Sequence, residues 1–352
     1  MSEEMPSTTA APRTRRFPDA RVVELDVSRP RLSASVVIPA YNAATYLAET
    51  LDSVAAQTQH PDEVFVVDDG SRDDTATIAR DHPVVTEVIQ RPNGGMCAAR
   101  NEGIERSKSD LVFLLDSDDI WHPRHVERLT AMMAAHPKAA FGFAEYTAWP
   151  CHAEDRPSFN PDPEESIEVL DLDQYTQRTT RGRIVLPSFQ VFRSTALRVL
   201  GDRPYREDHW QAESLFVNGL VGCYGSIVRH VESLGLYRLH RTQVTADEHA
   251  SAESILPCVE DLLTASRGGL GLGLDIDPAS RRILKRHVRD WNRSAGRRLG
   301  GCGDKAAGRR AMWRALQLGD RKAAAFLMMS LVPGLSDKVW KSAWRDRSAI
   351  DV

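Results

Sequence analysis

Short apolar runs alternate with amphipathic segments between residues 33 and 119. The apolar runs are typical of strands that are buried on both faces of a sheet. The segments between them place apolar side chains at helical spacing, as with Leu47, Leu51 and Val54. The pattern predicts strands at 33–42, 62–71, 84–95 and 110–119, separated by helices at 43–57, 73–82 and 96–108.

This alternation of strands and helices predicts an α/β fold with a mostly parallel central sheet, flanked by helices. Polar side chains gather at the carboxyl end of each expected strand, which is the edge where ligands of open α/β sheets bind. They are Tyr41 and Asn42, Asp68 and Asp69, Asn93, and the run from Asp116 to Asp119. Four polar strand ends at one edge predict a single binding site there.

The rest of the chain is less regular. Residues 150–180 mix acidic residues with proline and are expected to form a flexible lid or insertion. Strand and helix patterns resume at 183–201, 206–222 and 226–245, and helices are expected at 279–299, 304–320 and 321–335. We therefore expect a disordered arm at 1–30, an α/β domain at 31–250 divided near residue 120, and a small basic α-helical region at 251–352.

Opposite charges gather in two parts of the 352-residue chain, although its net charge is only −4. From Arg281 onward there are 18 Lys+Arg and 6 Asp+Glu, a net charge of +12, so the preceding residues carry −16. An acidic body suits a bound metal ion, and a basic tail suits an anionic surface.

No apolar run reaches the ~18 residues of a membrane span, and the N-terminus lacks a secretory signal. Five scattered cysteines without a C-x-x-C pair favour a reducing cytoplasm.

The segment Phe113–Asp119 carries the strongest candidate chemistry. Asp116 and Asp118 end an apolar strand, where carboxylates suit Mg2+ or Mn2+ because these cations prefer oxygen ligands. The alternative is an acidic cap on the following helix. One aspartate would serve as a cap, whereas three within four residues repel one another without a cation. We therefore prefer a metal site, with phosphate groups of a substrate supplying further ligands.

Two other strand ends are candidate ligand contacts. Asp68 and Asp69 precede a Gly-Ser turn, where a carboxylate can accept the imide N–H of a uracil, although the same residues suit an ordinary turn. Gly94 and Gly95 precede a helix that contains Arg100, and they allow a ligand to approach the backbone and the helix N-terminus. A plain glycine turn is the simpler explanation of that pair.

Two candidate motifs lie in the second half of the α/β domain. Glu207 and Asp208 begin an expected helix, where a carboxylate could act as a general base or simply complement the helix dipole. Arg238 and His240 lie in a basic stretch that could neutralise a leaving diphosphate. His240 could also complete a metal shell, or the stretch could be an exposed basic strand end.

Six segments in this order resemble the family 2 glycosyltransferases, which have the GT-A fold: SVVIPAYN, VFVVDDGSRDDT, NGGMCAARNEGI, FLLDSDDIWHP, YREDHW and YRLH. The resemblance runs from Ser33 to Thr245. It implies a nucleotide-binding half at 31–120, an acceptor half at 121–250, and an inverting transfer from a nucleotide-diphosphate sugar, by default a UDP-sugar. The turn before Glu207 has one glycine where the family commonly has more, which leaves the acceptor open.

The resemblance also implies roles for individual residues. Asp208 would be the catalytic base, supported by Glu207. Asp116 would lie against the ribose, and Asp118 would hold Mg2+ or Mn2+ on the diphosphate, with Asp116 and His240 as further candidate metal ligands and Asp119 behind them. Asp69 would read the base. The nucleotide site as a whole would comprise Pro39, Ala40, Tyr41, Asn42, Asp68, Asp69, Gly94, Gly95, Arg100, Asp116, Ser117, Arg238 and His240.

Other functions and partners follow from the same residues. A phosphohydrolase would carry its D-x-D motif on the first strand, followed by Gly-Thr, and this chain does not. A non-catalytic nucleotide-sugar-binding protein or scaffold is the main alternative, although Glu207 and Asp208 speak against it. The acceptor could be a glycan, a lipid-linked sugar or a small molecule.

The basic tail, with its four tryptophans, either contacts the inner face of the membrane or packs on the α/β domain. We prefer the second interpretation. Nucleic acid is not expected because the acidic body would repel it.

Overall fold

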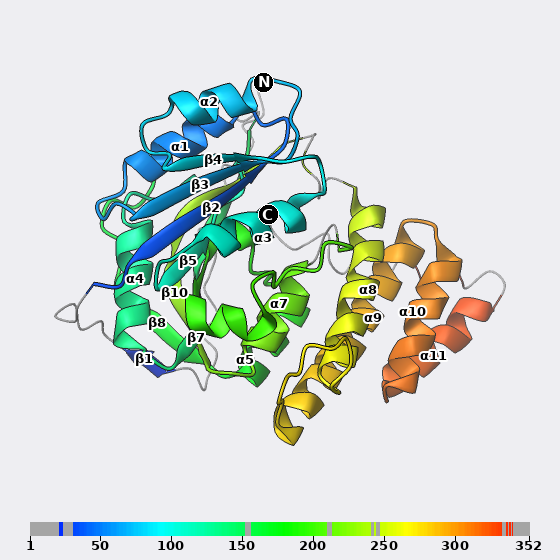
Figure 1. Ribbon diagram of the computed structural model, residues 1–352. Helices are drawn as coiled ribbons and strands as arrows, with labels where there is room; N and C mark the ends of the chain where they lie inside the picture. Colours follow the sequence, from blue (N-terminus) through cyan, green and yellow to red (C-terminus); the bar gives the residue numbers. More distant parts are fainter. Residues whose placement is uncertain are drawn as a thin grey trace, which may run out of the picture.

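The fold is described from a computed structural model. The structure describes residues 21–23, 31–151, 156–209, 213–240, 243, 247–332, 336, 338 and 340. In these residues one ten-stranded sheet is covered by helices, and further helices extend to one side (Figure 1).

The first half of the α/β domain is built as the sequence predicts. Its strands are β2 (Ala34–Ala40), β3 (Glu63–Asp68), β4 (Glu87–Gln90) and β5 (Leu111–Leu114), and its helices are α1 (Leu47–Ala55), α2 (Thr75–Asp81) and α3 (Met96–Arg106). β2 pairs in parallel with β3 and β5, and β3 pairs in parallel with β4. Every residue of β2 is buried, because the strand has a partner on each side and helices on both faces. Its unbroken apolar run follows from this position.

The second half contributes strands in both directions. Its elements are β6 (Ile120–Trp121), α4 (His125–Ala135), β7 (Ala139–Pro150), β8 (Ile167–Leu170), α5 (Leu172–Thr180), η1 (Pro187–Phe189), β9 (Gln190–Arg193), α6 (Ser194–Leu197), η2 (Arg198–Leu200), α7 (Glu213–Val221) and β10 (Ser226–Leu239). β10 pairs in parallel with β7, whereas β9 runs antiparallel to both β5 and β7. The sheet is therefore mixed in this half, because a short apolar run does not specify the direction of its neighbours.

Strand β1 (Arg21–Val23) is at one edge of the sheet. The strand order is β1-β8-β10-β7-β9-β5-β2-β3-β4, with β6 pairing β10 off this path.

Two apolar cores lie on the two faces of the sheet. Val37 packs in the core covered by α3, α5 and α7, whereas Val36 and Ile38 pack in the core covered by α1, α2 and α4. This alternation buries both faces of β2.

Two expectations about irregular segments are wrong. The lid expected over 150–180 contains β8 and α5, because Ile167, Val169 and Leu170 suit a strand and a capping box of Asp171 with Gln174 begins the helix. Residues 21–23, placed in the disordered arm, form β1 against β8. The remainder of the expected arm, 1–20 and 24–30, lies outside the described residues.

The acidic loop that remains is bound to α4. Asp162 pairs with Arg124 at 2.7 Å, and Glu165 pairs with Arg128. The backbone carbonyl of Asn160 lies 2.8 Å from His122 Nε2. These contacts explain why the loop is rich in acidic residues, since its carboxylates neutralise the two arginines at the start of α4.

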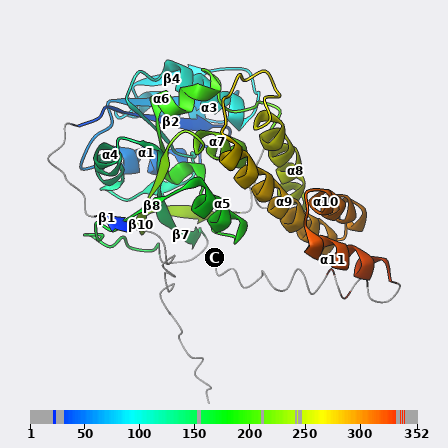
Figure 2. The ribbon, with the colours of Figure 1, turned by 90° about the horizontal axis from the view of Figure 1, so that it is seen from below.

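The C-terminal region is helical, as expected. It comprises α8 (Glu248–Ala265), α9 (Pro278–Gly301), α10 (Lys305–Gln317) and α11 (Arg321–Leu331). α8 packs against α7 and α9, and α11 lies farthest from the sheet (Figures 1 and 2). Among the helices that the structure describes, none is long and apolar enough to cross a bilayer.

The tryptophans of this region do not form one surface. Trp291 and Trp340 are only 3% and 1% exposed, so both pack inside the helical region. Trp340 lies against Gly300 of α9, where any side chain would collide with its ring. Trp313 is 57% exposed, and Trp344 lies outside the described residues. Trp291 also belongs to the apolar core on one face of the sheet, whereas Trp340 packs among residues of α10 and α11, so the expected packing on the α/β domain holds for Trp291 and not for Trp340.

Candidate active site

The carboxyl ends of β2 and β3 are joined by a network of short hydrogen bonds. Ala40 is the register partner of Asp68, and the Asp69 amide donates to the Ala40 carbonyl at 2.9 Å. Asn42 has a left-handed backbone, with φ of 49°, and its side-chain oxygen accepts from the Arg72 amide at 2.9 Å. Pro39 and Ala40 are buried, and Tyr41, which follows them, is 49% exposed at the strand edge. The predicted turn residues are therefore brought together.

Asp68 and Asp69 are both buried and accept hydrogen bonds from the protein. Asp68 accepts from the Ser71 amide and from the Gln90 side chain, each at 3.0 Å. Asp69 accepts from Arg91 Nη1 at 2.5 Å and from the amides of Gly94 and Gly95, at 3.0 and 2.7 Å. Asp69 thus anchors the glycine loop, and the two glycine amides that were candidates for a ligand donate to it.

Asp116 is held by Arg100, which comes from α3. Arg100 is 1% exposed, and its guanidinium donates to Asp116 Oδ1 at 2.6 Å and to Glu213 of α7. Burial alone would lower the pKa of Arg100, but the two carboxylates raise it above its ordinary value. Gly103 allows this placement, because a Cβ there would lie 2.4 Å from Val37, so α3 packs directly on β2. Arg100 is therefore a permanent cation beneath the loop formed by Asp116 to Asp119.

Asp119 lies beneath the loop, away from solvent. It is 1% exposed, accepts from the Ser188 hydroxyl at 2.5 Å, and accepts from the Arg238 amide at 2.9 Å. Burial, together with the nearby Asp118 and Asp116 charges, raises its pKa well above the usual range. Its contacts fix the turn that presents Asp118.

Asp118 and His240 meet at the open side of the loop. Asp118 Oδ2 lies 2.8 Å from His240 Nε2, and the two side chains are 27% and 8% exposed. A carboxylate oxygen beside an imidazole nitrogen fits Mn2+ or Mg2+ as two of its ligands. Within the described part of the chain, no three acidic, histidine or cysteine side chains are grouped for a metal. A cation here would therefore need oxygen ligands from a substrate.

Arg238 is buried under this pair. Its guanidinium lies 4.7 Å from the ring centres of both Tyr46 and Trp149, donates to the Asp118 carbonyl at 2.7 Å, and binds Glu49. A cation between two aromatic faces is strongly favoured when it is desolvated. Arg238 is 4% exposed, and its contacts support the loop formed by Asp116 to Asp119. The neighbouring Ser117 carbonyl accepts from Thr50 at 3.0 Å, which ties the loop to α1.

Glu207 and Asp208 lie in a turn and not in the first turn of a helix, because α7 is described from Glu213. Glu207 pairs with Arg203 at 2.7 Å, and this bond lowers the pKa of Glu207. The Asp208 side chain is 62% exposed and pairs with Arg206 at 2.5 Å. Burial is the largest single influence and raises the pKa of Asp208, but the hydrogen bond and the charge of Arg206, together with His209, outweigh it, and the pKa is lowered. Asp208 is therefore ionised and accessible.

Two helices hold this turn in place. From α3, Asn101 donates to Glu207 at 3.3 Å and to the Tyr205 carbonyl at 2.7 Å. From α8, Asp261 forms an ion pair with Arg206, with its carboxylate oxygen 2.8 Å from Nε, and it lies 3.0 Å from His209 Nε2. Sequence patterns do not reveal Asn101 or Asp261 as site residues, because each lies in an ordinary helical segment far from the turn that it contacts.

The fold is that of the GT-A glycosyltransferases. The structure of Staphylococcus aureus TarS 1-349 in complex with UDP matches with a TM-score of 0.61 at 18% identity, over 90% of this chain and 92% of that chain. The mannosyltransferase PcManGT from Pyrobaculum calidifontis, in complex with GDP-Man and Mn2+, matches with a TM-score of 0.56 at 17% identity, over 93% and 91% of the two chains. At these identities the likeness establishes the fold class, as the sequence predicted.

Residues 35–200 belong to glycosyl transferase family 2, whose model matches that segment. An uncharacterized glycosyltransferase of Rickettsia prowazekii is 40% identical over 93 residues, which are 26% of this chain and 29% of that protein. A putative teichuronic acid biosynthesis glycosyltransferase of Bacillus subtilis, TuaG, is 35% identical over 117 residues, 32% of this chain and 46% of that protein. The chain thus spans less than half of the length of these curated relatives.

Proposed function

We propose that this chain is an inverting glycosyltransferase that moves a sugar from a nucleotide-diphosphate donor to an acceptor hydroxyl. The observation that carries the proposal is the double contact made by α3. Arg100 binds Asp116 at 2.6 Å, and the adjacent Asn101 binds Glu207 at 3.3 Å. One helix thus links the loop after β5 to the turn with Asp208, so the proposed donor site and the proposed base are held by the same element.

Asp208 takes the role of general base in this proposal. It removes the proton of the acceptor hydroxyl while the hydroxyl oxygen attacks the anomeric carbon. The new C–O bond forms as the bond between that carbon and the diphosphate oxygen breaks, and the electron pair leaves with the nucleoside diphosphate. Attack from the face opposite the leaving group inverts the anomeric configuration, and no nucleophilic side chain is needed. Glu207 supports the turn through Arg203.

We place a divalent cation, Mg2+ or Mn2+, at Asp118 and His240, with Asp116 as a further ligand. When bound, the cation would neutralise charge on the diphosphate. The chain's own contribution is to hold these ligands: Arg100 fixes Asp116 and Arg238 fixes the backbone of Asp118. The mannosyltransferase PcManGT, solved with GDP-Man and Mn2+, supports this proposal by likeness of fold.

We assign the nucleotide to the edge formed by Pro39–Asn42 and Asp68–Asp69. A carboxylate offers about four lone-pair positions, and Asp69 already accepts from Arg91, Gly94 and Gly95. The Gly94 amide is shared between the two oxygens of Asp69, so all four positions are engaged, and a contact with a base would replace the longer 3.2 Å contact. TarS has been solved with UDP and with UDP-GlcNAc, so a UDP-sugar is our first donor, with GDP-mannose as the competitor to test.

The decisive experiment compares Asp208→Asn with wild type in a screen of UDP-sugars and GDP-mannose with Mn2+. Loss of the base should lower kcat by about a hundredfold to ten-thousandfold, while the Kd of the donor stays unchanged. Asp202→Asn is the matched control, because Asp202 is an exposed aspartate six residues before Asp208, and it should keep full activity. Equal rates in wild type and Asp208→Asn would overturn the assignment.

The main alternative is a non-catalytic nucleotide-sugar-binding scaffold. It would bind the donor with the same dependence on Asp118, yet transfer no sugar to any acceptor and show no difference between wild type and Asp208→Asn. Glycans, lipid-linked sugars and small metabolites should all be offered as acceptors, because the comparisons leave the acceptor open.

We also propose a cytoplasmic location with peripheral contact to an anionic membrane. The five cysteines, all within the described residues, form no disulfide with one another, which suits a reducing compartment. Trp313 of α10 is 57% exposed and lies four residues after Arg309, so an aromatic side chain and a cation are near each other at the surface. Co-sedimentation with anionic vesicles should fall in Trp313→Ala, whereas equal binding would remove Trp313 from the contact.

A further inference from the structure

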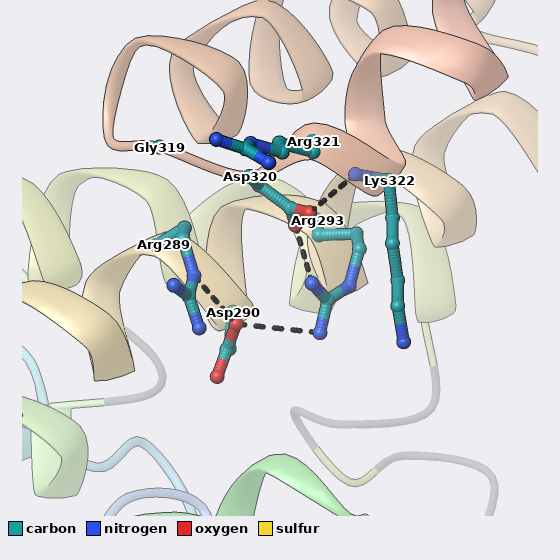
Figure 3. Close-up of a pocket in the computed structure, with 7 residues that line it drawn as sticks. All are labelled: Arg289, Asp290, Arg293, Gly319, Asp320, Arg321 and Lys322. Atoms are coloured by element: carbon teal, nitrogen blue, oxygen red, sulfur yellow. Dashed lines mark hydrogen bonds and ion pairs between the residues drawn. The ribbon is translucent and has the colours of Figure 1, made fainter.

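A cavity of about 360 Å³ lies where α9 meets the turn between α10 and α11. Its lining residues are Arg289, Asp290, Arg293, Gly319, Asp320, Arg321 and Lys322 (Figure 3). None of them belongs to the candidate active site. The volume is that of a small-ligand site, and its side chains are almost all charged, which points to a charged ligand.

The two carboxylates of the cavity are already neutralised inside it. Asp290 accepts from Arg289 Nε at 3.0 Å and lies 3.3 Å from Arg293 Nη2. Asp320, whose side chain is 4% exposed, binds Arg293 and accepts from the Lys322 amide at 2.9 Å. These contacts place the guanidinium groups of Arg289 and Arg293 beside the two carboxylates (Figure 3).

The cations of the cavity outnumber its acids. Four cationic and two acidic side chains give a local charge of +2. Arg321 and Lys322 are exposed, and their side chains form no hydrogen bond or ion pair with the residues described by the structure. The surrounding segment, residues 278–332, has 14 Lys+Arg and 3 Asp+Glu. An anion entering the cavity would therefore meet unneutralised positive charge that is weakly screened over a few ångströms.

We propose that this cavity binds a phosphate group, as a phosphate monoester or diester. Guanidinium groups pair two N–H donors with two oxygens of a phosphate, and an ammonium group adds a point charge. A neutral sugar would leave the excess cations unpaired. The phosphate could belong to a soluble molecule or to a lipid headgroup, and both present the same chemistry to Arg321 and Lys322. The site stands apart from sugar transfer and does not depend on it.

The test uses the full chain and a double variant, Arg321→Ala with Lys322→Ala. Binding of inorganic phosphate is measured by calorimetry, and binding to vesicles of phosphatidylcholine, with and without phosphatidylglycerol, is measured by co-sedimentation. The matched control is Arg281→Ala with Arg282→Ala, which removes two exposed cations of α9 outside the cavity. Both pairs are on the surface, so both variants should fold, which circular dichroism checks.

We expect the Arg321/Lys322 variant to bind at least about tenfold more weakly, while the Arg281/Arg282 variant matches wild type. Phosphate binding without vesicle binding would identify a soluble ligand, and binding only to phosphatidylglycerol vesicles would identify a headgroup; both support the site. The proposal fails if the two variants weaken binding equally, or if wild type binds neither probe. Because transfer is not measured, this result is independent of the Asp208 experiment.

Discussion

Asp261 of α8 pairs with Arg206, its carboxylate oxygen lying 2.8 Å from Arg206 Nε. The same arginine binds Asp208 through Nη2 at 2.5 Å, so a C-terminal helix orients the proposed base through a single guanidinium. The Asp261 carboxylate also contacts Nε2 of His209, the residue that follows Asp208. The helical region thus helps to shape the active site.

Asp261→Asn should reduce kcat while leaving the KM of the donor within about twofold, because the donor site is formed by other elements. Weakening the hold on Arg206 misplaces Asp208, and a loss of about tenfold corresponds to about 1.4 kcal/mol. Glu260→Gln is the matched control, because Glu260 is the adjacent residue of α8 and pairs with Arg314 of α10. Equal rates in the two variants would show that Asp261 has no positioning role.

The pH dependence of kcat/KM should tell Asp208 and Glu207 apart. Arg206 stabilises the ionised form of Asp208 and lowers its pKa. In Arg206→Met the pKa of Asp208 should rise, and the acid limb of the profile should move to higher pH. Arg203→Met removes the corresponding partner of Glu207 and should leave the limb in place. If only Arg203→Met moves the limb, Glu207 is the base.

Substitutions of the adjacent residues Asp118 and Asp119 should affect different properties, namely the metal requirement and the stability of the fold. Asp118→Asn removes a proposed metal ligand at a partly exposed position, so the Mn2+ concentration for half-maximal activity should rise by about tenfold or more, with little change in Tm. Asp119→Ala leaves the Arg238 amide and the Ser188 hydroxyl without their buried acceptor, which costs about 3 kcal/mol of unfolding free energy. Thermal unfolding and metal titration of both variants separate the roles, and a swapped pattern would refute them.

Local patterns predicted the parallel strands and the four polar strand ends, because a buried strand followed by a turn leaves a clear signature in the sequence. They did not predict that Arg100 would be buried between Asp116 and Glu213, or that Asp261 would reach Arg206. Such pairs join elements that are distant along the chain, and nothing local distinguishes a buried arginine in a helix from an exposed one. The same limit applies to β1 and β8, whose pairing depends on neighbours across the sheet.

Stability should decrease in mild acid because three histidines are buried. Burial lowers the pKa of His125 and His287 to about 3 and that of His230 to about 4. The unfolded chain, with a histidine pKa near ~6.5, binds more protons, so each histidine contributes stability above that pH that is lost as the pH falls. The expected loss is about 1 kcal/mol per histidine between pH ~6.5 and ~5.5.

Urea unfolding measured across this range checks the expectation, and His287→Leu should reduce the pH dependence of the unfolding free energy by one histidine's share. His60→Gln is the control, because it removes a histidine that is exposed at the surface. If His287→Leu keeps the full wild-type pH dependence of the unfolding free energy, the buried imidazole of His287 is not a source of the acid sensitivity, and this prediction is wrong.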